Sequence, residues 1–309
     1  MTGRCDVETW CEGVYFEPGP NKPNLAGIIL SCGIHGDETG PIHLLQRLHN
    51  ELQLAALAPS RPLLLIFGNP DAIRHQQRYV DSNLNRLFTR TPSPQPVAGE
   101  SREAARARQL MQVCQRFQQQ VPQVDLHLDL HSTIKRSCIE RFALTPVHSG
   151  HYSDRWLGQL WQAGFGGLVH QTRRANTFSQ FSLDVLGADS FTLECGSLQQ
   201  SDEPHDQRLW HWLVNLVGSE VAWHTKEPGG RQQPALRQFT VAEEIIRASD
   251  QFRFLVDEGL PNFSQHPPGT AIYQEARGTF TIDEERFSLF LNSRVETGQR
   301  AGLLLKHLQ

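Results

Sequence analysis

The sequence lacks the features of membrane proteins and nucleic-acid-binding proteins. No stretch approaches the roughly 18 consecutive apolar residues of a membrane span, and the N-terminus "MTGRCDVETWCEG" has no apolar segment typical of a signal peptide. The formal net charge is -4, and the basic residues are scattered along the chain. This balance gives no general attraction to nucleic acid or to an anionic membrane. We therefore expect a cytoplasmic protein with neither partner.

The sequence also lacks closely paired cysteines. The six cysteines are widely dispersed and form no CxxC pair, which argues against a thiolate zinc site and against a disulfide framework. What the chain does have is length: 309 residues, of which 39% are hydrophobic, can bury a full core. One large domain followed by a smaller one is the expected organisation.

The first two thirds of the chain alternate between strand and helix patterns. The apolar runs "LAGIILSC" and "PLLLIFGNP" each end in a turn and precede an amphipathic stretch, a pattern typical of buried parallel strands joined by helices. Further strands are predicted in "QVDLHLDLHS", "ERFALTP" and "DSFTLECG", and further helices over 100–120, 156–161, 177–186 and 203–223. Residues 1–224 are therefore predicted to form an α/β domain.

The composition changes at "TKEPGGRQQPA", which is dense in Gly, Pro and charge. We expect a linker over 225–234. Beyond it the helix signal fades, and short β-type runs such as "GTAIYQE", "GTFTI" and "AGLLLK" alternate with Gly and Pro. Residues 235–309 are predicted to form a smaller, β-rich domain.

A histidine and a glutamate lie three residues apart in "SCGIHGDETG", where an apolar run meets a helical pattern. Imidazole and carboxylate are ordinary zinc ligands, and a tight turn after a strand can direct His35 and Glu38 at one point. The alternative is that Glu38 favours a helix N-terminus and His35 is a polar turn residue. A third ligand must come from elsewhere in the chain.

The alternating segment "DLHLDLHS" supplies that third ligand. Its period of two places His127, Asp129 and His131 on one face of a strand. His131 is favoured as the ligand because it lies at the strand's carboxyl end, while His127 lies mid-strand and is the rival ligand or a packed histidine. Asp129 could orient His131. Two histidines and one glutamate leave a fourth position for water, as in catalytic zinc sites.

Hydrolysis at such a site also needs a base that is not a ligand. Glu194, in "DSFTLECGS", is the candidate because it ends an apolar strand, where an unpaired carboxylate is costly unless it faces a site. The alternative is a glutamate that faces solvent at the strand end.

The segment "NPDAIRHQQRYVDSNLNRLF" brings two arginines and two amides close together in sequence. Arg78, Asn83, Asn85 and Arg86 lie just after a predicted strand, an arrangement suited to binding carboxylates or an oxyanion. A surface turn with solvated charges would show the same residues.

Several spaced motifs, "GIHGDETGP", "GNPDAIRHQQRYVDSNLNRLF", "DLHSTIK" and "TLECGS", resemble the succinylglutamate desuccinylase/aspartoacylase family of zinc amidohydrolases, relatives of the metallocarboxypeptidases. The C-terminal "PNFSQHPPGTAIY" and "FLNSRVETGQRAGLLL" resemble the bacterial desuccinylases in particular. One departure is Asp37, where the family usually has Asn. The resemblance implies a carboxypeptidase-like α/β domain with a mixed sheet, and a β-rich C-terminal domain that narrows access to the site.

The resemblance also implies the residue roles. One Zn²⁺ per subunit would be held by His35, Glu38 and His131, with Glu194 as general base and Arg78 polarising the substrate carbonyl. Asn85 and Arg86 would contact a substrate carboxylate, and Arg173 or Arg174 could add positive charge. The expected reaction is hydrolysis of N-succinyl-L-glutamate, a small acidic substrate, in arginine catabolism.

Other activities remain open from the sequence. A related N-acyl amino acid deacylase such as aspartoacylase, a metallocarboxypeptidase, or a metal-binding protein without turnover would share the same ligands. Glu194 argues against the last, because a binding protein needs no base there. The sequence is also compatible with a homo-oligomer.

Overall fold

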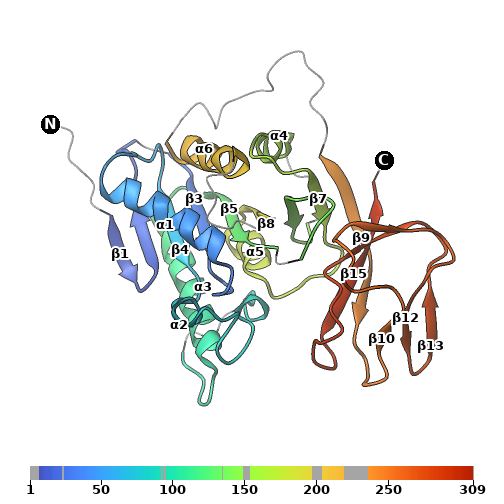
Figure 1. The fold of residues 1–309 in the computed structure, drawn as a ribbon. Helices are drawn as coiled ribbons and strands as arrows, with labels where there is room; N and C mark the ends of the chain where they lie inside the picture. Colours follow the sequence, from blue (N-terminus) through green and yellow to red (C-terminus); the bar gives the residue numbers. More distant parts are fainter. Residues whose placement is uncertain are drawn as a thin grey trace, which may run out of the picture.

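The computed structural model describes residues 7–22, 24–91, 93, 95–133, 135–148, 154–196, 204–218 and 236–308. The predicted linker over 225–234, and the end of the helix predicted over 203–223, lie outside the described residues. Figure 1 shows an α/β part that leads into C-terminal strands at one side of the molecule. Within the described ranges, no helix is long and apolar enough to cross a membrane.

The α/β part is built on eight strands of a mixed sheet. Their order in space is β1-β2-β4-β3-β5-β8-β6-β7. The neighbours β4, β3, β5 and β8 run parallel, while β1 and β2 pair antiparallel and β6 pairs antiparallel with β8. The strands span Glu8–Cys11 (β1), Val14–Glu17 (β2), Gly27–Cys32 (β3), Leu63–Phe67 (β4), Val124–His131 (β5), Phe142–Thr145 (β6), Gly167–His170 (β7) and Asp189–Glu194 (β8).

Helices cover both faces of this sheet (Figure 1). They span Thr39–Gln53 (α1), Pro70–His75 (α2), Arg102–Gln120 (α3), Asp154–Gln162 (α4), Phe178–Phe181 (α5) and Pro204–Gly218 (α6), with a 3-10 turn at Leu84–Arg86 (η1) and a π-helical turn at Ser182–Leu186 (η2). Apolar residues of α1, α4 and α6 pack in one cluster with one face of the sheet. Those of α3, α5 and η2 pack in a second cluster with the opposite face. The result is a three-layer domain.

The C-terminal strands extend the same sheet. They span Arg237–Ile246 (β9), Arg253–Phe254 (β10), Ser264–His266 (β11), Ala271–Glu275 (β12), Gly278–Thr281 (β13), Arg286–Leu289 (β14) and Arg300–His307 (β15). Strand β9 pairs parallel with β7, and the order continues β9-β15-β14-β11. Strands β10, β12 and β13 form a separate three-stranded sheet. The β-rich character of this region is confirmed, but the continuity of its sheet with the α/β domain was not predicted.

The two parts also share a hydrophobic cluster. Ile139, Phe142 and Val169 of the α/β part pack with Phe239 and Leu305 of the C-terminal strands. Burying apolar surface across this boundary stabilises one fixed arrangement of the two parts.

Backbone contacts reinforce the same boundary. The N–H of Asn262 donates to the carbonyl of Arg136 at 2.8 Å, and the N–H of Cys138 donates to the carbonyl of Asn262 at 2.9 Å. Both contacts involve the loop that follows the His131 strand. The C-terminal domain is therefore held directly beside the carboxyl ends of the central strands.

Candidate active site

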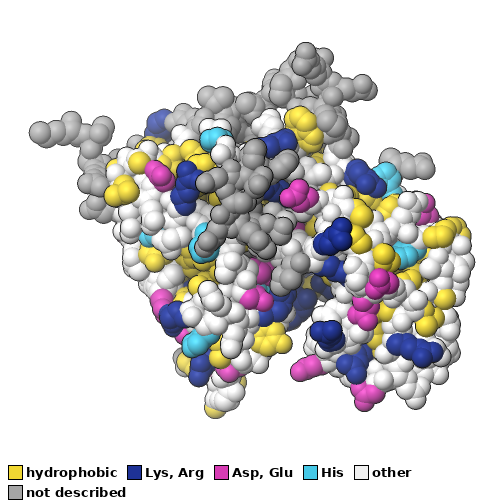
Figure 2. All heavy atoms as spheres, in the orientation of Figure 1, with side chains coloured by type: hydrophobic (Ala, Val, Ile, Leu, Met, Phe, Trp, Pro, Cys, Tyr) yellow, Lys and Arg dark blue, Asp and Glu magenta, His cyan; other side chains and the backbone are white. Residues whose placement is uncertain are grey.

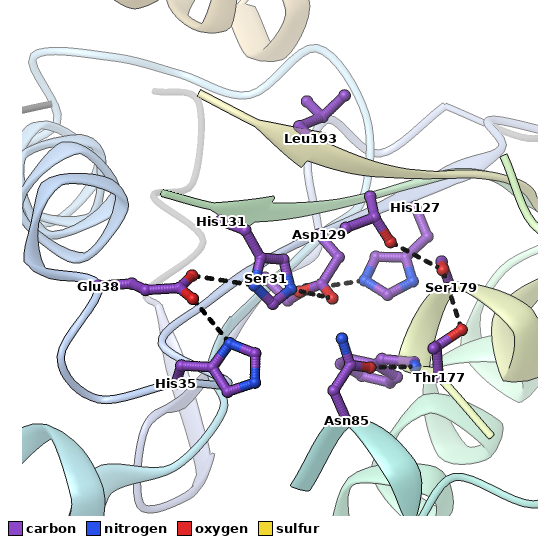
Figure 3. A network of polar contacts seen from close by, with 12 residues as sticks. Ser31, His35, Glu38, Asn85, His127, Asp129, His131, Thr177, Ser179 and Leu193 are labelled. Carbon is purple, nitrogen blue, oxygen red and sulfur yellow. Dashed lines mark hydrogen bonds and ion pairs between the residues drawn. The ribbon is translucent and has the colours of Figure 1, made fainter. Parts of the chain in front are cut away.

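The candidate site lies where three adjacent parallel strands end. Strands β3, β5 and β8 are neighbours in the sheet, and His131 of β5 is paired in register with Glu194 of β8. The carboxyl ends of parallel strands meet at one edge, which is where ligands bind in open α/β sheets. His35 and Glu38 follow β3 at this same edge (Figure 3).

The turn after β3 owes its path to a close approach between backbones. A Cβ atom on Gly36 would lie 2.1 Å from the carbonyl carbon of Ala72 in α2. Only glycine fits at such a contact. The turn is therefore pressed against α2, and this directs His35 and Glu38 toward the strand ends.

His35, Glu38 and His131 form one buried cluster. The Nδ1 atom of His35 lies 2.8 Å from Oε1 of Glu38, and Nδ1 of His131 lies 2.9 Å from Oε2. One ligand atom from each residue falls within 4.8 Å of the others. Both imidazoles therefore present the same nitrogen to the space around one carboxylate.

The remaining polar atoms of the cluster contact neighbouring polar groups. Nε2 of His131 contacts Oδ2 of Asp129 at 2.9 Å, and Nε2 of His35 contacts Oδ1 of Asn83 at 3.2 Å. The Ser132 N–H donates to Oε2 of Glu38 at 3.0 Å. Such contacts fix ring orientation and leave Nδ1 as the nitrogen available to a metal.

The charges of the cluster are strongly coupled. Burial alone would lower the pKa of His131, but the carboxylates of Asp129 and Glu38 raise that pKa well above its usual value. Burial alone would raise the pKa of Glu38, but His131 and His35 hold it well below its usual value. The pKa of His35 is lowered, chiefly by burial. A buried carboxylate pair thus faces one cationic imidazole, an electrostatic environment that favours a cation.

The donor set fits a divalent metal. Two imidazole nitrogens and one carboxylate oxygen are donors found in catalytic metal sites with an open position. These residues could therefore hold a metal ion, with Asp129 and Asn83 orienting the two histidines.

Glu194 lies beside this cluster and outside it. Its Oε2 accepts a hydrogen bond from the Thr133 hydroxyl at 2.9 Å. Burial raises the pKa of Glu194 to about 7, although the positive charge of His131 partly opposes this. A carboxylate that titrates near neutrality can both accept and donate a proton.

His127 does not join the cluster. Its ring is fully buried, with Nε2 at 2.8 Å from the Ser31 hydroxyl and Nδ1 at 2.7 Å from the Ser182 hydroxyl. Burial lowers the pKa of His127 to about 4, so the ring is neutral. With both nitrogens in hydrogen bonds, His127 supports the sheet behind Asp129.

The segment around η1 brings the predicted arginines and amides to the rim of the site. Arg78 donates to Oε1 of Glu38 at 3.1 Å, so it contacts a cluster residue directly. Asn85 is buried, and its Oδ1 accepts from the Phe178 N–H at 2.9 Å, which leaves its amide nitrogen pointing toward the histidines (Figure 3). Arg86 donates to the carbonyl of Asn85 at 2.7 Å.

Sequence reasoning missed the residue that holds this segment in place. The buried Glu103 carboxylate accepts hydrogen bonds from three consecutive backbone N–H groups, those of Val80, Asp81 and Ser82, at 2.7, 3.1 and 3.1 Å. It also accepts from Nδ2 of Asn69 at 3.2 Å. Its sequence position, in the first turn of α3, looks like that of any glutamate that favours a helix N-terminus.

Three further residues named from the sequence make no hydrogen bond or ion pair with His35, Glu38 or His131 within the described part of the chain. Arg173 is 3.4 Å from Glu244 and is largely exposed, while Arg174 pairs with Asp184. One carboxylate oxygen of Asp37 is buried and has no hydrogen-bond partner among the described residues. None of the three enters the cluster.

Comparison with known proteins agrees with this geometry. The model of the succinylglutamate desuccinylase/aspartoacylase catalytic domain matches residues 24–216. The chain belongs to this family. The barrel-sandwich hybrid domain of the same family matches residues 234–308, so the predicted combination of a carboxypeptidase-like α/β domain and a β-rich domain is confirmed.

Curated and solved members of the family cover most of the chain. The succinylglutamate desuccinylase of Pseudomonas aeruginosa strain UCBPP-PA14 is 38% identical over 291 residues, which cover 92% of this chain and 85% of the relative. The crystal structure of succinylglutamate desuccinylase from Chromobacterium violaceum matches with a TM-score of 0.81 and 28% identity, covering 98% of this chain and 91% of the other.

A second solved desuccinylase, from Vibrio parahaemolyticus, has a TM-score of 0.83 and 25% identity and covers 96% of this chain and 86% of the other. Murine aminoacylase 3, at 18% identity and a TM-score of 0.63, shares the fold. The family is one of hydrolases, and the described residues of this member include a group, His35, Glu38 and His131, that could hold a metal ion.

Proposed function

We propose that the protein hydrolyses the amide bond of N-succinyl-L-glutamate to succinate and L-glutamate, using one zinc ion held by His35, Glu38 and His131. The observation that carries the proposal is the buried His-Glu-His cluster with Glu194 beside it. The similarity to the Pseudomonas aeruginosa desuccinylase, at 38% identity, supports the choice of substrate. The corresponding role is in arginine catabolism in the cytoplasm.

When bound, zinc supplies Lewis acidity, which lowers the pKa of a water molecule and polarises the scissile carbonyl. The protein's own residues carry the proton. Glu194 takes a proton from the attacking water and returns it to the nitrogen of the departing glutamate. The pKa of about 7 that burial gives Glu194 suits both transfers.

Arg78 supports the charge that develops on the carbonyl oxygen. Its guanidinium already reaches the site, where it donates to Glu38 at 3.1 Å. Attack by water on the amide carbon converts the carbonyl to a tetrahedral oxyanion, and a positioned cationic donor stabilises that charge. Collapse of the oxyanion expels the glutamate nitrogen and regenerates the carbonyl as a succinate carboxylate.

The substrate carries three carboxylates, while the protein has a formal net charge of -4. Local positive charge must therefore compensate at the site. Arg86 lies on the same segment as Arg78 and has the fork geometry that binds a carboxylate through two N–H groups. Asn85 presents its amide nitrogen on the same side (Figure 3).

The test is release of free amino acid from two substrates by the purified, zinc-loaded protein. N-succinyl-L-glutamate should be hydrolysed, and N-acetyl-L-aspartate should be hydrolysed at least about 100-fold more slowly, since it lacks the succinyl carboxylate. Glu194→Gln serves as the inactive control in the same preparation. Preferential turnover of N-acetyl-L-aspartate would support the proposed hydrolysis but contradict the proposed substrate. Activity on neither compound would contradict both the reaction and the substrate.

A further inference from the structure

Arg300 lies at the boundary between the two domains, on the first residue of β15, where it pairs with Ile246 of β9. Its side chain is 23% exposed, and its Nη1 lies 3.6 Å from Oε1 of Glu244. The other oxygen of Glu244 lies 3.4 Å from Nη1 of Arg173. One carboxylate thus faces two guanidinium groups.

A further guanidinium approaches from the α/β domain. Arg86 keeps an exposed face, but desolvation, followed by the positive charges of Arg300 and Arg78, lowers its pKa to about 10. Within the described residues, its guanidinium makes one hydrogen bond, to the carbonyl of Asn85. The positive charge of Arg300, from the β-rich domain, therefore acts on Arg86, from the α/β domain.

Positive charge is in excess at this boundary. Glu244 is the carboxylate whose charge reaches Arg86, and it already contacts Arg173 and Arg300. Arg78 is engaged with Glu38. Like charges held together without a counter-ion repel, and an anion placed between them removes the repulsion. Figure 2 shows basic side chains along the hollow that separates the α/β part from the C-terminal strands.

We propose that Arg86 and Arg300 together bind one carboxylate of the substrate, so that the anion bridges the α/β domain and the β-rich domain. The proposal rests on the proposed function, because it assigns a substrate contact to the same site. Planar guanidinium forks match a carboxylate in two-point contact, so two of them can hold both of its oxygens. Glu244 acts here as the positioning residue that holds Arg300.

The neighbouring arginines are less suited to the role. Arg174 is paired with the buried carboxylate of Asp184, and the Arg173 side chain is 71% exposed. Arg300 extends from a strand of the continuous sheet, which fixes its backbone at the boundary between the domains. A residue on a rigid strand loses less conformational entropy on binding than one on an exposed loop.

The test compares Arg300→Met with Arg253→Met in the zinc-loaded full chain. Arg253 is an exposed arginine of the same domain whose guanidinium donates to the Gln274 side chain. For Arg300→Met, the KM for N-succinyl-L-glutamate should rise about tenfold or more while kcat stays within about threefold, as expected when a charged hydrogen bond to substrate is lost. The Arg253→Met variant should match the wild type.

A second variant and two product measurements make the result specific. Arg300→Lys keeps the charge beside Glu244 and should raise KM by less than Arg300→Met. The inhibition constants of succinate and of L-glutamate then identify the carboxylate, because only the product that carries it should bind more weakly to Arg300→Met. An unchanged KM in Arg300→Met, or inhibition constants that are both unchanged, overturns the proposal.

A different result is expected if the proposed function itself is wrong. In that case the wild type would not hydrolyse N-succinyl-L-glutamate at all. Thermal stabilisation of the wild type by millimolar succinate or L-glutamate would still report the carboxylate contact, and its loss in Arg300→Met but not in Arg253→Met would support it. Equal stabilisation of the wild type and of Arg300→Met would overturn it.

Discussion

The two domains differ in what they bury. At the carboxyl edge of its sheet, the α/β domain buries a chain of hydrogen-bonded ionisable groups, His35, Glu38, His131 and Asp129, with Glu194 beside it. In the described C-terminal residues 236–308, the buried polar side chains are Asn262, His266 and Ser288, each in a hydrogen bond. Charged groups are costly to bury without partners, so their concentration at one sheet edge marks the functional end of the molecule.

The difference shows how the domains divide their roles. The α/β domain holds the residues that could bind a metal and the buried Glu194 carboxylate, whose pKa is near 7. The β-rich domain contributes apolar packing to the shared cluster and, at its border with the α/β domain, the charged pair Glu244 and Arg300.

The largest effect expected from this division is at Glu194. Glu194→Gln keeps the size of the side chain and removes its ability to take a proton, so kcat should fall by about 10²- to 10⁴-fold. Zinc content, measured on the same sample, should equal that of the wild type because Glu194 lies outside the ligand cluster. The exposed Glu296→Gln, from the β-rich domain, is the matched control and should keep full activity. Activity of Glu194→Gln within tenfold of the wild type would contradict the assignment.

The next largest effect tests whether the domains are thermodynamically separate. Phe239 is fully buried in the shared cluster, with its ring 5.1 Å from Phe263 and 5.3 Å from Phe287. Phe239→Ala should lower the free energy of unfolding by about 3–5 kcal/mol. None of the six tryptophans lies in residues 224–309, so tryptophan fluorescence carries no direct signal from the C-terminal strands.

Urea unfolding followed by tryptophan fluorescence and by far-UV circular dichroism should therefore shift together in Phe239→Ala. The exposed Leu255→Ala should stay within about 0.5 kcal/mol of the wild type. A fluorescence midpoint that does not move while the dichroism signal shifts would show two independent units instead.

A smaller effect is expected at Glu103, whose carboxylate accepts hydrogen bonds from the backbone of residues 80–82. Glu103→Ala leaves three backbone N–H groups without their acceptor, and this should cost on the order of 3 kcal/mol of the free energy of unfolding. The segment carrying Arg78 and Arg86 should loosen, so that kcat/KM falls even at temperatures where the protein is folded. Glu103→Gln keeps one acceptor oxygen, so its free energy of unfolding should lie between those of the wild type and of Glu103→Ala. A stability of Glu103→Ala within about 0.5 kcal/mol of the wild type would contradict this role.

The mildest perturbation is pH. Because burial raises the pKa of Glu194 to about 7, the carboxylate is lost as pH falls through that value, and kcat/KM should drop about tenfold per pH unit on the acid side. A bound cation would lower the pKa of Glu194, so the acid-side decline of kcat/KM should be centred at or below pH 7. Zinc content measured at each pH separates this effect from metal loss. A rate that stays constant down to about pH 5 in zinc-loaded protein would count against Glu194.

The sequence indicated which residues meet in the candidate site because strand ends can be identified from local patterns. His35, Glu38, His131 and Glu194 each follow or end an apolar run, and such runs become the adjacent parallel strands β3, β5 and β8. Helices such as α3, which spans Arg102–Gln120, were expected over nearly the same residues because their apolar spacing is regular.

The rest depends on pairings between distant residues. Strands β1, β2, β7, β9 and β11 were not predicted, since they are short or, like β9 with "VAEEII", mix charge into the apolar pattern. No local signal shows that β9 joins β7 and so continues the sheet into the second domain. The same limit hid Glu103, whose acceptor role depends on a loop more than 20 residues away in the chain, and the contact of Glu244 with Arg300.

The measurement that tests the central claim most directly is a zinc titration of the metal-free protein, with hydrolysis of N-succinyl-L-glutamate measured at each step. Activity should be absent after chelation, rise linearly with added zinc, and saturate at one zinc per chain. His131→Ala should bind zinc weakly and stay inactive in the same titration. Full activity in protein stripped of metal, or saturation at two zinc ions per chain, would contradict a single hydrolytic metal at the end of β3, β5 and β8.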